Sequence, residues 1–94
     1  MNGIWKLNGM FFGWVTNNGS LYSQNGNRIG TLIDNVFYNH NGAYIGELLN
    51  NNRIGYNSDH NDWVGPVCYV DGQILAEPLE NLLANEVIGY NSPE

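Results

Sequence analysis

The sequence contains one cysteine and three basic residues, and both shortages exclude classes of protein. A lone cysteine, Cys68, cannot form an intramolecular disulfide framework or supply a cysteine zinc cluster. Only Lys6, Arg28 and Arg53 are positive, and the net charge is −6. The chain therefore offers no basic face to nucleic-acid phosphates or to an anionic membrane, and we expect neither partner.

Long apolar runs are also missing from the sequence. No stretch approaches the ~20 apolar residues that span a bilayer, and no apolar segment follows a basic N-terminal region, as it would in a secretory signal. Together with the single cysteine, these absences favour a reduced, cytoplasmic setting. The 94 residues predict a single domain, 1–94, with a modest core.

The chain contains one sequence repeat in three copies, at residues 5–15, 22–32 and 38–48. Each copy begins with an aromatic residue, which is followed by Asn-Gly and then by a second glycine. A large apolar residue precedes that second glycine, and another apolar residue lies two places after it. A degraded fourth copy covers residues 56–67, where residues 58–62 replace the Asn-Gly pair.

The repeat length predicts one β-hairpin per copy, because sixteen or seventeen residues suit two strands and their turns. Asn-Gly favours a tight two-residue turn with both residues at positive φ. A second set of turns is predicted between the copies, at 17–20, 34–35, 50–52 and 71–72. We therefore expect an all-β domain with hairpin repeats over residues 4–77.

The second glycines of the copies, Gly13, Gly30, Gly46 and Gly65, are predicted to lie inside strands. A glycine inside a strand marks a bulge, a sharp bend or a close approach of two backbones. Four such positions in register indicate that all the hairpins bend at one level around a shared axis. The predicted architecture is a pseudo-four-fold array, either flower-like or barrel-like.

The last third of the chain departs from this pattern. Residues 63–70 and 73–77 are predicted to form the fourth hairpin. Leucines at 79, 82 and 83 follow Pro78 with helical spacing, which predicts a short helix at about 78–86. Residues 87–91 then read as a closing strand that pairs with an early strand such as 4–8 and removes free edges.

The motif Tyr-x-x-Asn-Gly-x-x-Ile-Gly at Tyr22 and Tyr38 resembles the repeats of small bacterial proteins called four-fold β-flower proteins. The resemblance covers roughly residues 4–75. It implies pseudo-four-fold symmetry, but it brings no established activity and no functional residues.

Candidates for catalysis or metal binding are sparse. Cys68 with His60 or His40 is a nominal nucleophile–base pair, but a cysteine in a predicted strand favours a small buried residue. The turn carrying Asp59, His60 and Asp62 offers candidate metal ligands, but it lacks the ordered spacing of a calcium loop, and we interpret it as a solvated turn. We expect no catalytic residue, no metal and no cofactor.

The aromatic residues offer the best-defined candidates for binding. The equivalent positions Trp5, Tyr22, Tyr38 and Tyr56 are expected to form a belt, which we interpret as core. The alternative is that the belt lines an open face and stacks a ligand. Trp14 and Trp63 lie outside the repeated positions and are candidates for exposed contacts. The candidate ligand-binding residues are Trp14, Tyr38, His60 and Trp63.

The function that these features favour is a small non-enzymatic interaction module for a protein or a small polar ligand. A carbohydrate or cell-surface binding module is one alternative, and an enzyme or metal protein is another. A structural role is also open, because the run 10–15 and the leucines near 79–83 could be buried against a second copy in a homo-oligomer.

Overall fold

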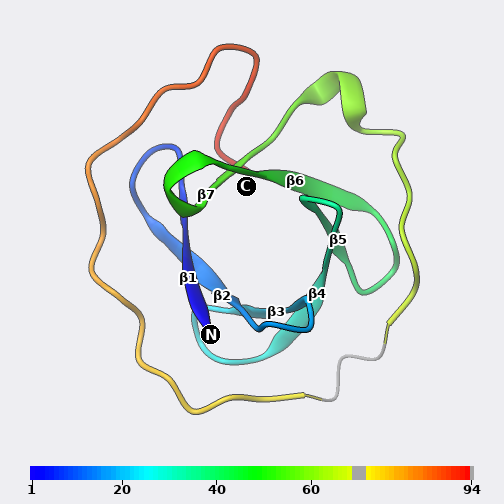
Figure 1. The fold of residues 1–94 in the computed structure, drawn as a ribbon, viewed down its shortest axis with the longest axis vertical. Coiled ribbons are helices and arrows are strands. Elements are labelled where there is room, and N and C mark those ends of the chain that lie inside the picture. The colour runs from blue at the N-terminus through cyan, green and yellow to red at the C-terminus, as the bar shows by residue number, and fades with distance from the viewer. Residues whose placement is uncertain (69–71, 94) are drawn as a thin grey trace.

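The computed structural model describes residues 1–68 and 72–93, and its central feature is a closed barrel of seven strands (Figure 1). Each strand is hydrogen-bonded to the next one in the sequence. The strands are β1 (Asn2–Lys6), β2 (Phe11–Val15), β3 (Ser20–Ser23), β4 (Arg28–Ile33), β5 (Val36–Asn39), β6 (Tyr44–Leu49) and β7 (Arg53–Gly55). The all-β prediction is confirmed.

The barrel closes between its first and last strands. Consecutive strands pair antiparallel, whereas β7 pairs parallel with β1 through Trp5↔Arg53 and Lys6↔Ile54. An odd number of strands requires one such parallel pair. Closure leaves the sheet without a free edge. The closing strand is thus β7, and the prediction that residues 87–91 close the ring is wrong.

The Asn-Gly pairs connect β1 to β2, β3 to β4 and β5 to β6, as predicted, but the loops are longer than expected. Only the glycine has positive φ, for example 95° at Gly9. Gly9 N–H donates to Lys6 O, and Lys6 N–H donates to Met10 O, so three residues form the loop. This is a β-turn followed by a left-handed glycine, a common three-residue hairpin.

The three hairpins share a β-bulge at the same position. Ile4 pairs with Gly13 and Trp5 pairs with Phe11, so Phe12 is the extra residue. Ile29 and Ile45 are skipped in the same way in the other two hairpins. The glycine permits a close backbone approach, since a Cβ on Gly13 would lie 2.1 Å from Tyr22 O. Of the three predicted explanations for the strand glycines, the bulge is confirmed in these three hairpins.

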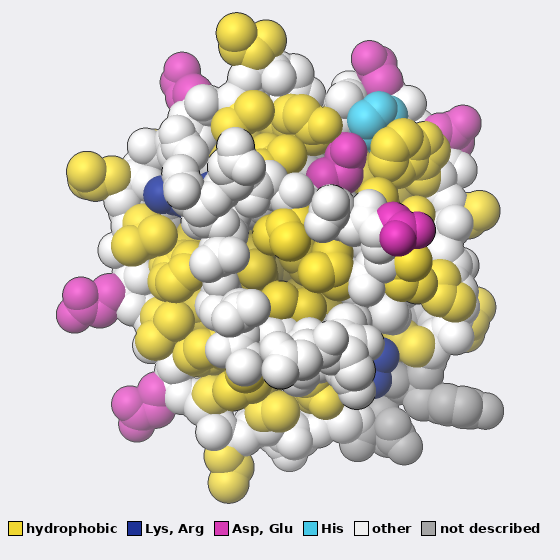
Figure 2. All heavy atoms as spheres, viewed as in Figure 1, with side chains coloured by type: hydrophobic (Ala, Val, Ile, Leu, Met, Phe, Trp, Pro, Cys, Tyr) yellow, Lys and Arg dark blue, Asp and Glu magenta, His cyan; other side chains and the backbone are white. Residues whose placement is uncertain are grey.

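The core fills the barrel from strands that alternate around it. Ile4, Leu21, Phe37 and Ile54 are almost completely buried, one each from β1, β3, β5 and β7. Burial of a large apolar side chain stabilises the fold by about 1.5–3 kcal/mol. Further apolar residues pack on them: Val15, Phe12, Ile29, Leu32, Ile45 and Leu48. Figure 2 shows hydrophobic side chains at the centre of one face, inside the ring of strands.

The C-terminal third runs around the outside of the barrel (Figure 1). We call residues 61–68 and 72–93 the outer segment. Its backbone N–H groups donate to the glycine carbonyls of the Asn-Gly loops: Gly65 to Gly42, Ile74 to Gly26 and Leu82 to Gly9, each at 2.8 Å. The contacts occur in reverse chain order, so the outer segment travels back past each hairpin.

The predicted fourth hairpin is not formed by the described residues. Val64 bridges to Ala43 and Gln73 bridges to Asn27, so the two halves lie against different loops of the barrel. The turn predicted at Asp71-Gly72 falls partly outside the described residues. Gly65 is also not equivalent to the bulge glycines, because it lies against the ring of Tyr38.

The predicted helix at 78–86 is wrong, since these residues form neither helix nor strand. Their backbone groups are bonded to the barrel instead: Leu82 N–H donates to Gly9 O, and Asn85 N–H donates to Leu7 O. The leucines do not form a buried stripe, and Leu83 is 88% exposed. A nine-residue helix is marginal by itself, and the unpaired loop carbonyls compete for its donors.

Helical structure in the described residues is limited to two short 3₁₀ turns, η1 (Asn50–Asn52) and η2 (Ser58–His60). Neither is long enough or apolar enough to cross a membrane. The η2 turn occupies the position of the degraded Asn-Gly pair and leads from β7 into the outer segment.

Candidate functional site

A pocket of about 780 Å³ opens at the end of the barrel that carries the Asn-Gly loops. Its residues are largely apolar or aromatic, and they include two amides, one serine hydroxyl and two phenol hydroxyls. The lining residues are Phe12, Ile29, Asn39, Tyr44, Ile45, Tyr56, Asn91, Ser92 and Pro93. None of these side chains carries a charge.

The bulges place the apolar side chains of this pocket. Phe12, Ile29 and Ile45 are the residues that the ladder skips in the three hairpins, and all three line the pocket. A bulge redirects the side chain of the extra residue. The sequence carried this signal, because a large apolar residue precedes the second glycine of every copy, but its role in a pocket was not predicted.

One wall of the pocket is the end of the outer segment, which returns to the barrel beside β6 and β7 (Figure 1). Tyr56 N–H donates to Asn91 O at 2.6 Å, and Asn91 N–H donates back to Tyr56 O at 2.8 Å. Asn8 N–H donates to Ser92 Oγ at 2.9 Å, and Pro93 is buried. We call residues 91–93 the pocket wall.

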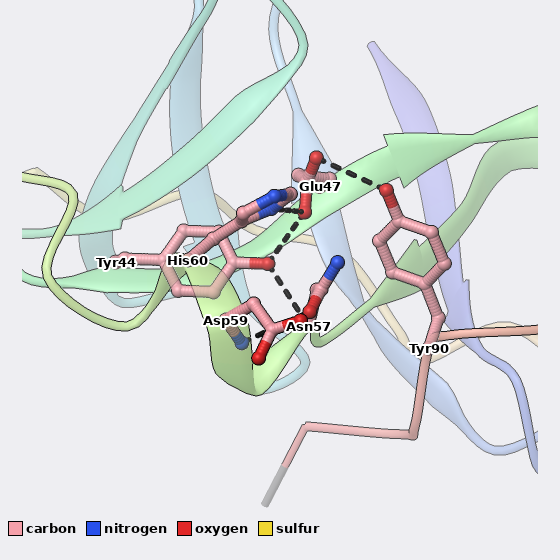
Figure 3. Close-up of polar contacts among 6 residues, drawn as sticks. All are labelled: Tyr44, Glu47, Asn57, Asp59, His60 and Tyr90. Atoms are coloured by element: carbon pink, nitrogen blue, oxygen red, sulfur yellow. Dashed lines mark hydrogen bonds and ion pairs between the residues drawn. The ribbon is translucent and has the colours of Figure 1, made fainter.

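A polar cluster centred on Glu47 adjoins the pocket (Figure 3). Glu47 Oε2 accepts hydrogen bonds from Tyr44 Oη at 2.6 Å and from His60 Nδ1 at 2.8 Å. Glu47 Oε1 accepts from Tyr90 Oη at 3.2 Å. The Glu47 side chain is only 14% exposed. One carboxylate thus binds donors from β6, from η2 and from the outer segment.

Aromatic stacking completes the cluster. The His60 and Trp63 rings lie parallel, with centroids 3.8 Å apart. Trp63 also meets Tyr44 edge to face at 5.7 Å, and the ring of Tyr44 lies 5.3 Å from that of Tyr56. Because Tyr44 and Tyr56 line the pocket, the cluster supports the pocket from behind.

The two phenols of the cluster are held in their neutral form. Burial raises the pKa of Tyr44, and its hydrogen bond to Glu47 raises that pKa further. Burial raises the pKa of Tyr90 as well, and the negative charge of Glu47 adds to the effect. Both hydroxyl groups therefore remain donors to Glu47 throughout the physiological pH range.

The four predicted ligand-binding residues are divided by the structure. His60 and Trp63 stack on each other, and Trp63 is 37% exposed. Trp14 is buried against Phe11, with ring centroids 5.1 Å apart. Tyr38 lies under Gly65 of the outer segment. None of the four lines the pocket at the barrel mouth.

The repeated aromatic residues do not belong to the barrel core, and that interpretation is wrong. Trp5 Nε1 donates to Glu80 O at 2.8 Å. Tyr22 lies beside Gly72, and Tyr38 lies beside Gly65. These three side chains are half-buried on the outside of the barrel, where the outer segment covers them. Only Tyr56 of the four faces the pocket.

The metal candidates Asp59, His60 and Asp62 do not converge. Within residues 1–68 and 72–93, no three His, Cys, Asp or Glu side chains lie close enough together to hold a metal ion. Asp59 N–H is bonded to Asn57 Oδ1, which caps η2. Cys68 is half-buried, and its backbone N–H donates to His40 O.

Sequence reasoning missed the Glu47 cluster and the pocket wall. Tyr44 and Glu47 are three residues apart on β6, but nothing in the sequence connects them to Tyr90. Comparison with known proteins adds nothing to this, since no protein-family model, no curated protein and no solved structure matches the chain.

Proposed function

We propose that this protein is a small, non-enzymatic binding module that holds a small molecule in the mouth of its barrel. The observation that carries this proposal is the uncharged pocket of about 780 Å³. Small-molecule sites usually measure about 300–1,000 Å³, are mostly apolar, contain a few placed polar groups and often occupy the mouths of β-barrels.

The lining defines the chemistry of the ligand. An apolar or aromatic body would pack on Phe12, Ile29 and Ile45. The Oδ1 atom of Asn39 already accepts hydrogen bonds from Asn41 N–H and Ala43 N–H. The side-chain NH2 group of Asn39 is therefore the part that can donate to a ligand. With no charged residue in the lining, the favoured ligand is neutral and carries a hydrogen-bond acceptor at one edge.

A filled-pocket variant tests this proposal. Neutral aromatic and aliphatic compounds would be screened by thermal shift against the wild type, against Ile45→Trp and against Val67→Trp. Val67 is 77% exposed on the outer segment, so its variant controls for adding an indole. We expect hits that stabilise the wild type and Val67→Trp but not a folded Ile45→Trp. Hits that bind all three equally would contradict the proposal.

The three bulged hairpins and the closed barrel also support the resemblance to four-fold β-flower proteins, and we propose membership of that family. A cytoplasmic setting is part of the same proposal, supported by the single cysteine. Carbohydrate binding by the repeated aromatic residues has less support, because the outer segment covers Trp5, Tyr22 and Tyr38.

A structural or oligomeric role is the second candidate. The outer segment exposes large apolar side chains: Val64, Val67, Leu75, Leu83 and Ile88. Exposed apolar side chains in such numbers favour contact with another protein surface. Residues 10–15 offer less surface for such a contact, because Phe11, Trp14 and Val15 are already buried within the chain itself. Light scattering after size-exclusion chromatography would test whether two copies associate.

A further inference from the structure

The carboxamide of Asn39, at the end of β5, has its orientation fixed by the loop that follows it. Its Oδ1 accepts hydrogen bonds from Asn41 N–H at 2.9 Å and from Ala43 N–H at 3.0 Å. Because two backbone donors point at this atom, it is the oxygen, and the other terminal atom of the carboxamide is the nitrogen Nδ2. Asn39 therefore presents an NH2 group, with two donor hydrogens, away from the loop.

The backbone groups of Asn39 are used by the same loop. Its N–H donates to Ala43 O at 2.8 Å, and its C=O accepts from Gly42 N–H at 3.0 Å. The NH2 group is thus the only polar group of Asn39 that has no partner among the residues the structure describes. Since Asn39 is half-buried and lines the pocket, this free donor belongs to the pocket.

Formation of the loop does not account for this NH2 group. In the other two Asn-Gly hairpins the residue equivalent to Asn39 is Lys6 or Ser23. The same loop forms there, because the loop glycine donates to the carbonyl of Lys6 at 3.0 Å and to that of Ser23 at 2.9 Å. Neither residue lines the pocket. Asparagine is therefore found at the one of these three positions that faces the pocket.

The free donor lies beside an aromatic surface. Asn39 is bonded to Ala43, which directly precedes Tyr44, and the ring of Tyr44 lies 5.3 Å from the ring of Tyr56. Both rings line the pocket, and so does the ring of Phe12. Aromatic rings pack well against other flat rings. A flat ligand can thus contact these rings and reach the Asn39 donor with its edge.

The hydroxyl group of Tyr44 is not free to receive the polar edge of a ligand. It donates to Glu47 Oε2 at 2.6 Å and accepts from Asn57 N–H at 3.0 Å. Its ring is the part that remains for contact with a ligand. The polar edge of the ligand therefore falls to Asn39, and the ligand must supply the acceptor.

We propose that the pocket selects neutral, flat aromatic compounds that carry a carbonyl group, and that Asn39 determines this specificity. The rings of the ligand pack on Phe12 and Tyr56, and its carbonyl oxygen accepts a hydrogen bond from Asn39 Nδ2. A carbonyl oxygen has lone pairs and no hydrogen, so it complements a group that can only donate. The inference rests on the proposed function, because it names the ligand class of the same pocket.

Asn39→Asp tests this specificity while it preserves the loop. Aspartate keeps an oxygen that accepts from Asn41 N–H and Ala43 N–H, and it replaces the NH2 donor with a second acceptor. Asn41→Asp is the matched control. It adds the same charge to the same loop, at an exposed side chain that does not line the pocket.

The probes are the bicyclic ketone indanone and its hydrocarbon analogue indane, which are both neutral and differ only by a carbonyl in place of a CH2 group. NMR titration of the Ile45 methyl groups, in the pocket lining, would give a Kd for each compound. Losing the donor and facing a second acceptor both penalise the ketone. We expect Asn39→Asp to weaken indanone relative to indane by about tenfold or more, and Asn41→Asp to leave this ratio unchanged.

The possible failures are distinguishable. If the ratio of the two Kd values is the same in the wild type and in Asn39→Asp, or if Asn41→Asp changes it equally, Asn39 does not select a carbonyl, although the pocket still binds. If neither compound shifts the Ile45 resonances in any variant at saturating concentration, the proposed function fails and this inference fails with it. Asn39→Ser, which introduces the residue of the second hairpin, removes the NH2 group without adding charge and should change the ratio in the same direction.

Discussion

Individual glycines decide how closely the strands of this barrel approach each other. At Gly30 a Cβ would lie 2.0 Å from Tyr38 O, a distance that real side chains do not adopt. The repeat predicted this position from sequence, because a glycine at the same place in three copies needs a backbone reason. The partner carbonyl could not be predicted, since it belongs to a neighbouring strand whose register the sequence does not specify.

Replacing Gly30 should therefore lower the free energy of unfolding more than replacing a glycine that has no close neighbours. We expect Gly30→Ala to lower the free energy of unfolding by roughly 1–3 kcal/mol, the usual cost of overpacking. Gly89→Ala, at positive φ but with nothing within 4 Å, should cost only about 1 kcal/mol. Urea unfolding would measure both variants. Equal losses would mean that the close approach at Gly30 carries no penalty.

The raised pKa values of Tyr44 and Tyr90 determine how the stability of the fold changes at alkaline pH. Their pKa values are raised in the folded protein by burial and by Glu47. In the unfolded chain, tyrosine ionises near pH ~10. The unfolded state therefore loses its protons first, so the stabilisation is fully present below pH ~10 and is lost as the pH rises above it.

We expect the free energy of unfolding to be flat up to pH ~10 and then to fall, and the fall should be smaller in Tyr44→Phe. Denaturant titrations at a series of pH values would measure this. If the wild type and Tyr44→Phe decline in parallel above pH ~10, the pKa of Tyr44 is not raised by folding.

The hairpins and the outer segment differ in how far their sequences predict their structure. The Asn-Gly pairs and the apolar residues beside them are local signals, so the strands, the bulges and the positions of the loops could be predicted. The three-residue form of the loops was not predicted. The outer segment bonds to loops far away in the chain, as Leu82 does to Gly9. Its leucines have helical spacing, but nothing local shows that unpaired carbonyls are available elsewhere. The helix prediction failed for that reason.

A proline pair tests the hydrogen bonds that hold the outer segment. Ile74 N–H donates to Gly26 O at 2.8 Å, whereas Leu75 N–H has no backbone partner among the described residues. Ile74→Pro removes the N–H donor and leaves the carbonyl of Gly26 without this partner, so we expect the free energy of unfolding to fall by about 1 kcal/mol or more. The side chain of Leu75 is fully exposed, so Leu75→Pro should leave the free energy of unfolding almost unchanged.

Limited proteolysis would separate these outcomes, because a loosened outer segment becomes a substrate while the barrel stays intact. Cleavage after residue 60 should be faster in Ile74→Pro than in Leu75→Pro. The same rate in both variants would show that the backbone bonds to the loops do not hold the segment.

At the scale of the whole molecule, the barrel and the outer segment have different structural roles. The barrel supplies the core and the apolar floor of a pocket. The outer segment covers three of the four repeated aromatic residues and supplies the pocket wall. Sequence reasoning found the repeat and the all-β class. It missed the pocket, because that site combines bulge residues with residues near position 91, more than forty positions after the last of them.

The most direct test of the binding site is methyl NMR of the wild type with the neutral compounds from the screen. The account predicts that a bound compound shifts the methyl resonances of Ile29 and Ile45 in the barrel mouth. It also predicts that Leu75 and Leu83, exposed on the outer segment, do not move. Shifts confined to Leu75 and Leu83, or no shift from any compound at saturating concentration, would contradict a binding site in the barrel mouth.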